Sequence, residues 1–564
     1  MQATREQWKG SQPVFLLSIE WNGRTFRAST EPILIPSSEG VDVQFHGGLV
    51  EDPDFSFELP DLGFQVSSYS TPIAVYLCDI DVAQQYSRQN TLENAKCELD
   101  YILVKEGQIQ NYEERVNLVH GIAKQPIYGH RDKAKSYIEF SIETPTVEAS
   151  ALPLSVGANQ IIDAISLSAL LNTSISPFNT IFKGGTTTID VNDVHKGKNL
   201  PLIIGQSGFY FDETGTKKYF GATPAYVIHA ISGSTNKIFL AIAGHEVDCE
   251  RVYIIDDLGN IRLENVDSFI TRTGDVFSFV EFVHGAGGFQ NPVDDENAKY
   301  FVSWFDGGGM RSPLTNAPVS GAGDLCLYLL TLGDNEVDFA AWYTVSTYLN
   351  RYKFAGAINS VEVTPLEFLE NEIIPFLPIS VIQGVEGIKP VLNLLSDAKF
   401  EAKGDLIASS EFVMTSGVST IGDSSRVINE YTLEYAYDMH QDQYRKTITI
   451  SGNTENLYQD KTASQQVVQS HLKYGTRPKK EQSNYIHDED TAAFVCFDKI
   501  RFNSIPSQTI TYQASPRFGY LEVGDIYKLT DQAANIENKI CQVIMLAWED
   551  TNWSVTLKIA PEGY

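Results

Sequence analysis

The chain has 564 residues, and its 42 Lys and Arg against 72 Asp and Glu give a formal net charge of −30. At about 150 residues per domain, this length predicts three or four domains. Hydrophobic residues make up 43% of the chain, which is typical of packed globular protein. The acid excess argues against a surface that grips nucleic acid or anionic lipid, because both need basic patches.

The N-terminus and the cysteines point to a chain made in a cytosol. Residues 1–8 carry no basic stretch followed by an apolar one, so no signal peptide is expected. No window approaches ~18 uninterrupted apolar residues, so no membrane span is expected. The cysteines are far apart and form no C-x-x-C pair, which predicts buried, reduced thiols rather than a zinc site. They are Cys78, Cys97, Cys249, Cys326, Cys496 and Cys541.

Residues 1–150 are predicted to form an N-terminal, tube-like β domain. An apolar strand over 14–21 meets Asn22-Gly23 and a second strand follows over 24–28. Asn-Gly between two such runs favours a hairpin, because a type I′ turn needs two positive φ angles. Apolar and polar residues then alternate in many short segments as far as Ile142, which favours an antiparallel sheet or barrel.

Residues 151–300 are predicted to form a mixed β domain. Short apolar strands lie between irregular stretches rich in Gly, Ser and Thr. The segment 161–171 fits a short helix or a strand equally well, because its periodicity does not decide between them. Asp257-Leu258-Gly259-Asn260 is a plausible hairpin turn.

Residues 301–400 are predicted to be mostly helical. Gly323-Asp324 precedes an apolar run, and Val337-Asp338 precedes an aromatic-rich helix that runs to about Asn350. Thr364-Pro365-Leu366-Glu367 has the pattern of a capping box with Pro at the first helical position.

Residues 401–564 are predicted to form a C-terminal β-rich α+β domain. Helices are expected over 462–474, ending at Gly475, and over 491–500, with acidic residues at the positive end. Alternation places Tyr431, Leu433, Tyr435 and Tyr437 on one face of a strand whose partner is 444–450. The fold class is therefore mainly β with α+β parts, in several domains.

Motifs for phosphate binding and nucleophilic catalysis are missing. No Walker loop, no G-x-G-x-x-G after a strand and no G-x-S-x-G elbow is present. The Gly-rich stretches 285–288 and 307–309 lack the lysine or the helix context, which favours plain loops. Gly205-Gln206-Ser207-Gly208 does not match the elbow pattern. A Ser-His-Asp triad, whose residues can lie far apart in the sequence, stays an open alternative.

The remaining clusters favour structural roles. The stretch 245–250, His-Glu-Val-Asp-Cys-Glu, is the densest in ligand-type residues, but a solvated acidic strand edge explains it better than a metal. The acids within 487–490 are explained by the start of a helix, because the positive end of a helix stabilises negative charge. The tyrosines of 431–437 could stack sugars, although core or interface packing is favoured. No catalytic, cofactor-binding or metal-binding residue, no cofactor and no enzymatic activity are predicted.

Taken together, four segments resemble the baseplate hub, or tail-tip hub, proteins of tailed bacteriophages. Each is a loose pattern of strand order with a few Gly, Pro and Asp. The first is the opening hairpin 15–30 with the strands 121–129 and 138–141. The others are the G-K-N-L-P-L-I-I-G stretch at 197–205, the run 323–330 with Val337-Asp338, and the C-terminal series from 474–478 through 490–493 and 521–525 to 553–559.

This resemblance implies a mechanical role. Such hubs are homotrimers in which each chain supplies two tube-like β domains, so that a pseudo-sixfold ring joins the tail tube to the threefold tip. The resemblance implies that residues 1–150 form the first of these domains and that 401–564 contain the second, together with a peripheral part. The implied partners are a ring of tail-tube or distal tail protein and a tip, fibre or spike protein. DNA would pass through the lumen without specific binding, in a virion part made in the host cytoplasm. The alternatives are a distal tail adaptor, a receptor-binding protein or, less favoured, a glycan hydrolase.

The resemblance gives the acid excess a candidate purpose. A channel that DNA slides through should not hold phosphates, and an acidic wall repels them. We therefore expect the acids to concentrate on the inner face of a ring. The alternative is that they only keep the surface soluble.

Overall fold

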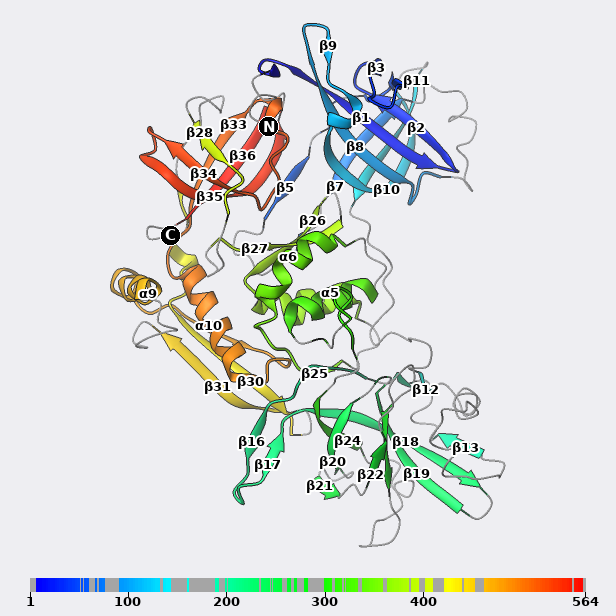
Figure 1. Ribbon diagram of the computed structural model, residues 1–564, viewed down its shortest axis with the longest axis vertical. Coiled ribbons are helices and arrows are strands. Elements are labelled where there is room, and N and C mark those ends of the chain that lie inside the picture. The colour runs from blue at the N-terminus through cyan, green and yellow to red at the C-terminus, as the bar shows by residue number, and fades with distance from the viewer. Residues whose placement is uncertain are drawn as a thin grey trace.

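The computed structural model shows a chain of several β units around a helical centre, which confirms the predicted fold class (Figure 1). It describes residues 7–50, 52–53, 55–59, 66–67, 70–76, 91–131, 135–143, 160–161, 188–191, 198–199, 201–232, 235–243, 245, 247–255, 261–264, 268–270, 278–282, 299–306, 310–316, 319, 321–332, 337–358, 363–384, 387–394, 401–408, 420–422, 424–438, 441–451, 461–549 and 552–560.

The N-terminal unit is an antiparallel sheet built on a long hairpin. The predicted turn is confirmed, with φ of 51° at Asn22 and 72° at Gly23. The strands run in the order β3-β4-β2-β1-β8-β10-β11-β7, and β9 pairs with β8. Their bounds are β1 Gln12–Trp21, β2 Arg24–Ser29, β3 Ile33–Ile35, β4 Val43–Gly47, β7 Ser70–Tyr76, β8 Lys96–Lys105, β9 Gln108–Ile109, β10 Val116–Arg131 and β11 Lys135–Glu143.

Backbone bonds after β4 close this sheet into a barrel. The N–H of Leu49 donates to the carbonyl of Ser29 at 3.1 Å, and the N–H of Val50 donates to the carbonyl of Ala74 at 3.0 Å. Leu49 also forms a bridge with Val75. These contacts connect the end of β2 to β7, the last strand of the path, so the sheet curls into a tube.

The C-terminal unit is a second sheet beside the barrel (Figure 1). Its order is β28-β34-β35-β36-β33-β29, and β5 from the N-terminal part of the chain pairs with β35. The bounds are β5 Ser56–Glu58, β28 Asp405–Ile407, β29 Thr420–Ile421, β33 Gln508–Ala514, β34 Ile526–Asp531, β35 Ile536–Glu549 and β36 Asn552–Ile559.

The central unit contains the helices. Asp338 caps α6 and Asp488 caps α10, each through its side chain, and Thr364 and Glu367 form the predicted capping box. The helices are α5 Ala322–Leu332, α6 Phe339–Leu349, α7 Pro365–Phe368, α9 Lys461–Tyr474 and α10 Glu489–Asn503. The strands with them are β6 Val66–Ser67, β15 Leu202–Ile204, β25 Gly356–Ile358, β26 Ile379–Gly384, β27 Gly387–Leu392, β30 Glu430–Asp438, β31 Gln443–Ser451 and β32 Pro478–Gln482.

The far unit is a sheet of order β21-β20-β24-β18-β19-β23-β22, with β13 on β18. A separate hairpin, β16 Phe209–Phe211 with β17 Lys217–Tyr219, projects from this end of the molecule (Figure 1). The other bounds are β12 Gln160–Ile161, β13 Thr188–Val191, β14 Lys198–Asn199, β18 Ala222–Ser232, β19 Thr235–Ala243, β20 Asp248–Ile255, β21 Ile261–Glu264, β22 Ser268–Ile270, β23 Ser278–Phe282 and β24 Lys299–Asp306.

The tyrosine face of β30 was predicted one residue too long. Tyr431, Leu433 and Tyr435 are buried in the central core as expected. Ala436 adopts a φ of 57° and donates its N–H to the carbonyl of Ile486 at 2.8 Å. This left-handed residue breaks the alternation, so Tyr437 leaves the buried face and packs on the ring of Tyr444, 5.2 Å away.

Some of the other sequence predictions are confirmed, and others concern residues that the structure does not describe. The partner strand of β30 is β31, as predicted, and Gly475 follows α9 with a φ of 70°. Residues 162–171, the turn at 257–260 and the Gly-rich stretches 285–288 and 307–309 lie outside the described residues. The domain boundaries stay predictions. The sheet of β24 continues to Asp306, and residues after 400 contribute to both the central unit and the C-terminal sheet.

Candidate functional site

The barrel and the C-terminal sheet meet in one buried aromatic cluster, which we call the junction. It contains Phe15 of β1, Phe55, Tyr101 of β8, Trp548 of β35 and Trp553 of β36, all of which are buried. Phe15 meets Trp548 edge to face at 5.3 Å, and Trp548 meets Trp553 in the same way at 5.4 Å. Each such pair of rings stabilises the fold by about 0.5–1.5 kcal/mol in addition to the contribution of the apolar area that it buries.

A hydrogen-bonded hydroxyl fixes the register of the junction. Tyr101 Oη donates to the backbone carbonyl of Pro516 at 2.5 Å, and Trp553 Nε1 donates to Tyr101 Oη at 3.4 Å. Burial raises the pKa of Tyr101 well above its usual range, so the hydroxyl keeps the proton that it donates. The buried hydroxyl therefore has both a donor and an acceptor, as stability requires.

The backbone crosses the junction as well. Strand β5 adds to β35, with Phe57 opposite Leu546. The N–H of Leu59 donates to Ile544 at 2.7 Å, and the N–H of Trp548 donates to Phe55 at 2.9 Å. A few residues later β6 pairs in parallel with β26 of the central unit. One N-terminal segment thus supplies strands to two other units, which ties all three together.

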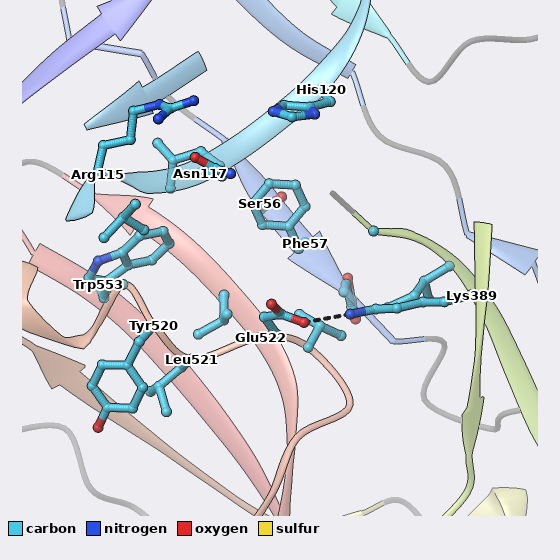
Figure 2. Close-up of a pocket in the computed structure, with 18 of the residues that line it drawn as sticks. Ser56, Phe57, Arg115, Asn117, His120, Lys389, Tyr520, Leu521, Glu522 and Trp553 are labelled. Carbon is cyan, nitrogen blue, oxygen red and sulfur yellow. Dashed lines mark hydrogen bonds and ion pairs between the residues drawn. The ribbon is translucent and has the colours of Figure 1, made fainter. Parts of the chain in front are cut away.

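A cavity of about 480 Å³ opens beside the junction (Figure 2). Its walls come from the start of β10, from β5, from the β26–β27 hairpin and from the C-terminal sheet. Lys389 and Glu522 form an ion pair at 2.6 Å across one side, and Lys403 pairs with Asp525 at 2.6 Å nearby. Since one side chain of each ion pair is well exposed, each pair contributes at most about 1 kcal/mol to the free energy of unfolding. The Lys389–Glu522 pair therefore connects β27 to the C-terminal unit, and the Lys403–Asp525 pair connects the segment before β28 to it.

A buried ion pair links β8 to the residue before β10, beside this cavity. Asp100 of β8 is only 2% exposed and accepts a hydrogen bond from Arg115 Nε at 2.8 Å. Burial raises the pKa of Asp100 to about 6, and the positive charge of Arg115 opposes that rise. The Arg115 guanidinium also lies over the ring of Tyr112, 4.2 Å from its centroid. The pair therefore holds the entry of β10 against β8.

The predicted ligand-type cluster serves the fold where it is described. His245 Nε2 accepts a hydrogen bond from the N–H of Ile203 at 3.0 Å, and Val247 is fully buried. The side chains of Glu246, Asp248 and Glu250 lie outside the described residues, so the solvated acidic edge stays a prediction. Within the described part of the chain, no three His, Cys, Asp or Glu side chains gather in a way that could hold a metal ion.

The cysteines that the structure describes fit the prediction of reduced thiols. Cys97, Cys326, Cys496 and Cys541 are buried and free. Burial raises the pKa of Cys97 and that of Cys541 to about 12, so both stay protonated at neutral pH. The described residues contain no helix long and apolar enough to cross a membrane.

One serine and one histidine come together far from the junction. Ser207 Oγ lies 3.3 Å from His487 Nδ1 and accepts the N–H of Gly221 at 2.5 Å. Both side chains are buried, and His487 stacks on Trp304 with ring centroids 6.3 Å apart. Burial lowers the pKa of His487 to about 4, so the ring is neutral. A buried hydroxyl that already bonds the backbone is a packing element rather than an exposed nucleophile.

Sequence reasoning missed the junction. It expected a strand around Phe55 and Phe57 but gave it no partner. The only local signal was aromatic content at both ends of the chain, which carries no information about pairing.

Comparison with known proteins gives a coarse structural likeness. No protein-family model and no curated protein matches the sequence. The chain is similar to the 43 kDa tail protein of prophage MuSo2 from Shewanella oneidensis, at 8% identity over 96% of this chain and 97% of that chain, with a TM-score of 0.32. It is also similar to the tail protein from Neisseria meningitidis MC58, at 11% identity over 97% of each chain, with a TM-score of 0.33.

A third similar structure is a chain in the virion of a native gene transfer agent particle. It shares 9% identity over 68% of this chain and 86% of that chain, with a TM-score of 0.36. These similar structures are thus two tail proteins and a chain of a virion particle. At these TM-scores the likeness does not assign a role to any residue.

A glycine substitution tests the junction. A Cβ at Gly519 would overlap the hydroxyl of Tyr101, whereas a Cβ at Gly404 meets nothing within 4 Å. We expect Gly519→Ala to lower the free energy of unfolding by about 1–3 kcal/mol, because the Tyr101–Pro516 contact must break or shift. Gly404→Ala should change the free energy of unfolding by no more than about 0.5 kcal/mol. Urea unfolding followed by tryptophan fluorescence measures both, and equal stabilities would contradict the role given to Tyr101.

The buried histidine predicts a pH dependence. Between pH 6.5 and pH 4 the unfolded chain binds a proton that the folded His487 does not, so stability falls as pH falls. By pH 4 this loss amounts to about 2–3 kcal/mol. In His487→Gln the free energy of unfolding should fall less than in the wild type between pH 6.5 and pH 4, by about 2–3 kcal/mol. Urea unfolding at pH 7, 5.5 and 4 compares the two proteins. Asp100, whose pKa shift has the opposite sign, is present in both and cancels from the difference.

Proposed function

We propose that this chain is a structural hub of a phage tail tip or baseplate. The observation that carries the proposal is the junction, in which a closed β barrel and a second β sheet share one hydrophobic core. A single chain can then supply two adjacent segments of a ring. Three such chains supply six segments, which matches a sixfold tail tube to a threefold tip.

The arrangement of the other units supports this proposal. The barrel and the C-terminal sheet lie side by side at one end of the molecule, and the central and far units extend from them to the other end (Figure 1). Extended strands β5 and β6 connect the ring-forming part to the rest through backbone hydrogen bonds. A chain with this shape can form a ring at one end and present its remaining units below it.

The proposed partners follow from this geometry. The ring would stack on a ring of tail-tube or distal tail protein, and the opposite end would hold a tip, fibre or spike protein. DNA would pass through the lumen without being bound, in a particle assembled in the host cell. The proposed role is structural, and the Ser207–His487 pair is buried, so it presents no exposed nucleophile.

Symmetry tests the proposal. We expect the purified full chain to form homotrimers by native mass spectrometry and threefold rings with six β segments by cryo-electron microscopy. The rings should bind tail-tube rings from the same virion. Hexamers would instead indicate an adaptor, and monomers that release soluble products from cell-wall glycan would indicate a hydrolase. Either result would overturn the hub proposal.

The acid excess gives a separate prediction. If DNA slides through the ring, the charge of −30 should be concentrated on the inner surface of the trimer. A charge map of the trimer from cryo-electron microscopy would measure this distribution. An even distribution, or a basic lumen, would mean that the acids serve solubility only.

A further inference from the structure

The sign of the charge reverses along α9 and the strand that follows it. Between residues 466 and 480 the sequence contains Lys473, Arg477, Lys479 and Lys480 and no acid. The formal charge of this stretch is therefore +4, whereas the average of the chain predicts about −1 for its length. A local difference of about five charges is not explained by the solubility of an acidic chain, because solubility needs charge of one sign only.

All four basic side chains are exposed, at the end of α9, in the turn after it and on β32. The two lysines of β32 form ion pairs with Glu481 and Glu434. Among the residues that the structure describes, no carboxylate forms an ion pair with Lys473 or Arg477. The charges of these two residues are therefore directed at the surroundings rather than balanced by described neighbours.

The outer face of α9 adds two apolar side chains to this surface. Val468 is 43% exposed and Leu472 is 84% exposed, and they share one face of the helix because they are four residues apart. Another face of α9 is fixed to the central unit, since Val467 is buried and Asn429 Nδ2 donates to Ser470 Oγ at 3.1 Å. The helix thus presents a firmly held surface, which we call the basic patch. It consists of Val468, Leu472, Lys473, Arg477, Lys479 and Lys480.

A surface of the opposite charge lies on the barrel. Residues 28–59 contain seven acids and neither Lys nor Arg, so their charge is −7, whereas the chain average predicts about −2. Two large apolar side chains are exposed in the same stretch, Leu34 at 55% and Val41 at 74%. We call the exposed residues around β3 and β4 the acidic patch. It consists of Glu31, Leu34, Glu39, Val41 and Asp42.

The loop that carries most of the acidic patch is held in one conformation. The N–H of Ser38 donates to the carboxylate of Glu113 at 3.1 Å, and the N–H of Tyr112 donates to the carbonyl of Pro36 at 2.9 Å. Glu113 is itself exposed and adds another acid beside the loop. Both patches therefore belong to preformed surfaces, which lowers the entropic cost of bringing them together.

The two patches lie on different flanks of the molecule. Figure 1 shows α9 on the flank of the C-terminal sheet, whereas β3 belongs to the barrel on the other flank. They do not meet within one copy, so a contact between them joins unlike surfaces of two copies. Contacts of this heterologous kind close into a ring when the rotation between copies allows it, and a homotrimer needs such a contact.

Charge favours a second copy over a nucleic acid or an anionic membrane as the occupant of the basic patch. Outside residues 466–480 the chain carries −34, which repels phosphates and anionic lipids over most of the surface. An interfacial membrane helix also needs a broad apolar face, and α9 exposes only two large apolar side chains in its described part. A second copy supplies the complementary charge and two exposed apolar side chains in one place.

We propose that the basic patch of one copy binds the acidic patch of a second copy. The inference rests on the proposed homo-oligomeric hub and adds to it the two surfaces that meet. The opposite charges steer the copies into one register and offset the repulsion between two acidic chains. The exposed side chains of Leu472 and Leu34 are covered in the contact, as apolar side chains are at the centre of an interface.

Charge reversal tests this contact on the full chain. We expect Lys473→Glu with Arg477→Glu to raise the dissociation constant of the homo-oligomer by about tenfold or more, because like charges then face each other. Glu39→Lys with Asp42→Lys should weaken assembly in the same way. The protein with all four substitutions should recover most of the wild-type affinity, since the two signs are exchanged. Sedimentation velocity over a concentration series measures each dissociation constant.

The matched control is Lys299→Glu with Lys353→Glu, which adds the same negative charge at two exposed lysines outside both patches. This control should associate nearly as tightly as the wild type. The difference between the Lys473→Glu, Arg477→Glu protein and the control should shrink in 0.5 M salt, because salt screens exposed charges. Equal weakening in the control would mean that total charge governs assembly, which would overturn the inference.

The remaining outcomes separate this contact from the hub itself. A Lys473→Glu, Arg477→Glu protein that assembles like the wild type would refute the contact and leave the hub standing. Failure of the four substitutions together to restore assembly would refute the pairing of the two patches. A wild type that stays monomeric would refute both proposals. Intact assembly with lost binding to phosphatidylserine vesicles would assign the basic patch to a lipid surface and overturn the inference.

Discussion

The contact between Tyr101 and the two tryptophans of the C-terminal sheet is the constraint on which the arrangement of the chain depends. It joins β8 of the barrel to β35 and β36, so the two β units share one core rather than touching across water. Its hydroxyl reaches a backbone carbonyl of the C-terminal unit, which fixes distance and angle together. A rigid pair of units is what a ring segment requires, because a loose hinge would let successive copies lose register.

Signals within a few residues predicted much of the local structure. Asn22-Gly23 specified a hairpin, and Thr364 and Glu367 specified a helix start, because the groups that satisfy each other lie next to each other in the chain. Ala436 shows the limit. Its left-handed φ goes with a hydrogen bond to Ile486, and no local pattern indicates that partner. The alternation of the preceding tyrosines therefore predicted a buried face that includes Tyr437, whereas the face ends at Tyr435.

The candidate site could not be predicted in the same way. Phe55 and Trp553 are almost at opposite ends of the chain, and their contact depends on β5 leaving its own unit to pair with β35. The sequence contains no Walker loop, no G-x-G-x-x-G after a strand and no G-x-S-x-G elbow. It could not indicate that Ser207 and His487 meet inside the core, where the ring stacks on Trp304 and carries no charge.

Strand β5 also sets the order in which the chain can fold. Its partner residues 545–547 are synthesised almost 490 residues after residues 56–58. At roughly 5–20 residues per second, a ribosome needs about 25–100 s to reach them. During that time β5, which lies between the barrel strands β4 and β7 in the chain, has no C-terminal sheet to join, and an unpaired strand edge invites wrong partners. The barrel can close early through Leu49 and Val50, but the C-terminal sheet is completed much later, by capture of a strand made long before it.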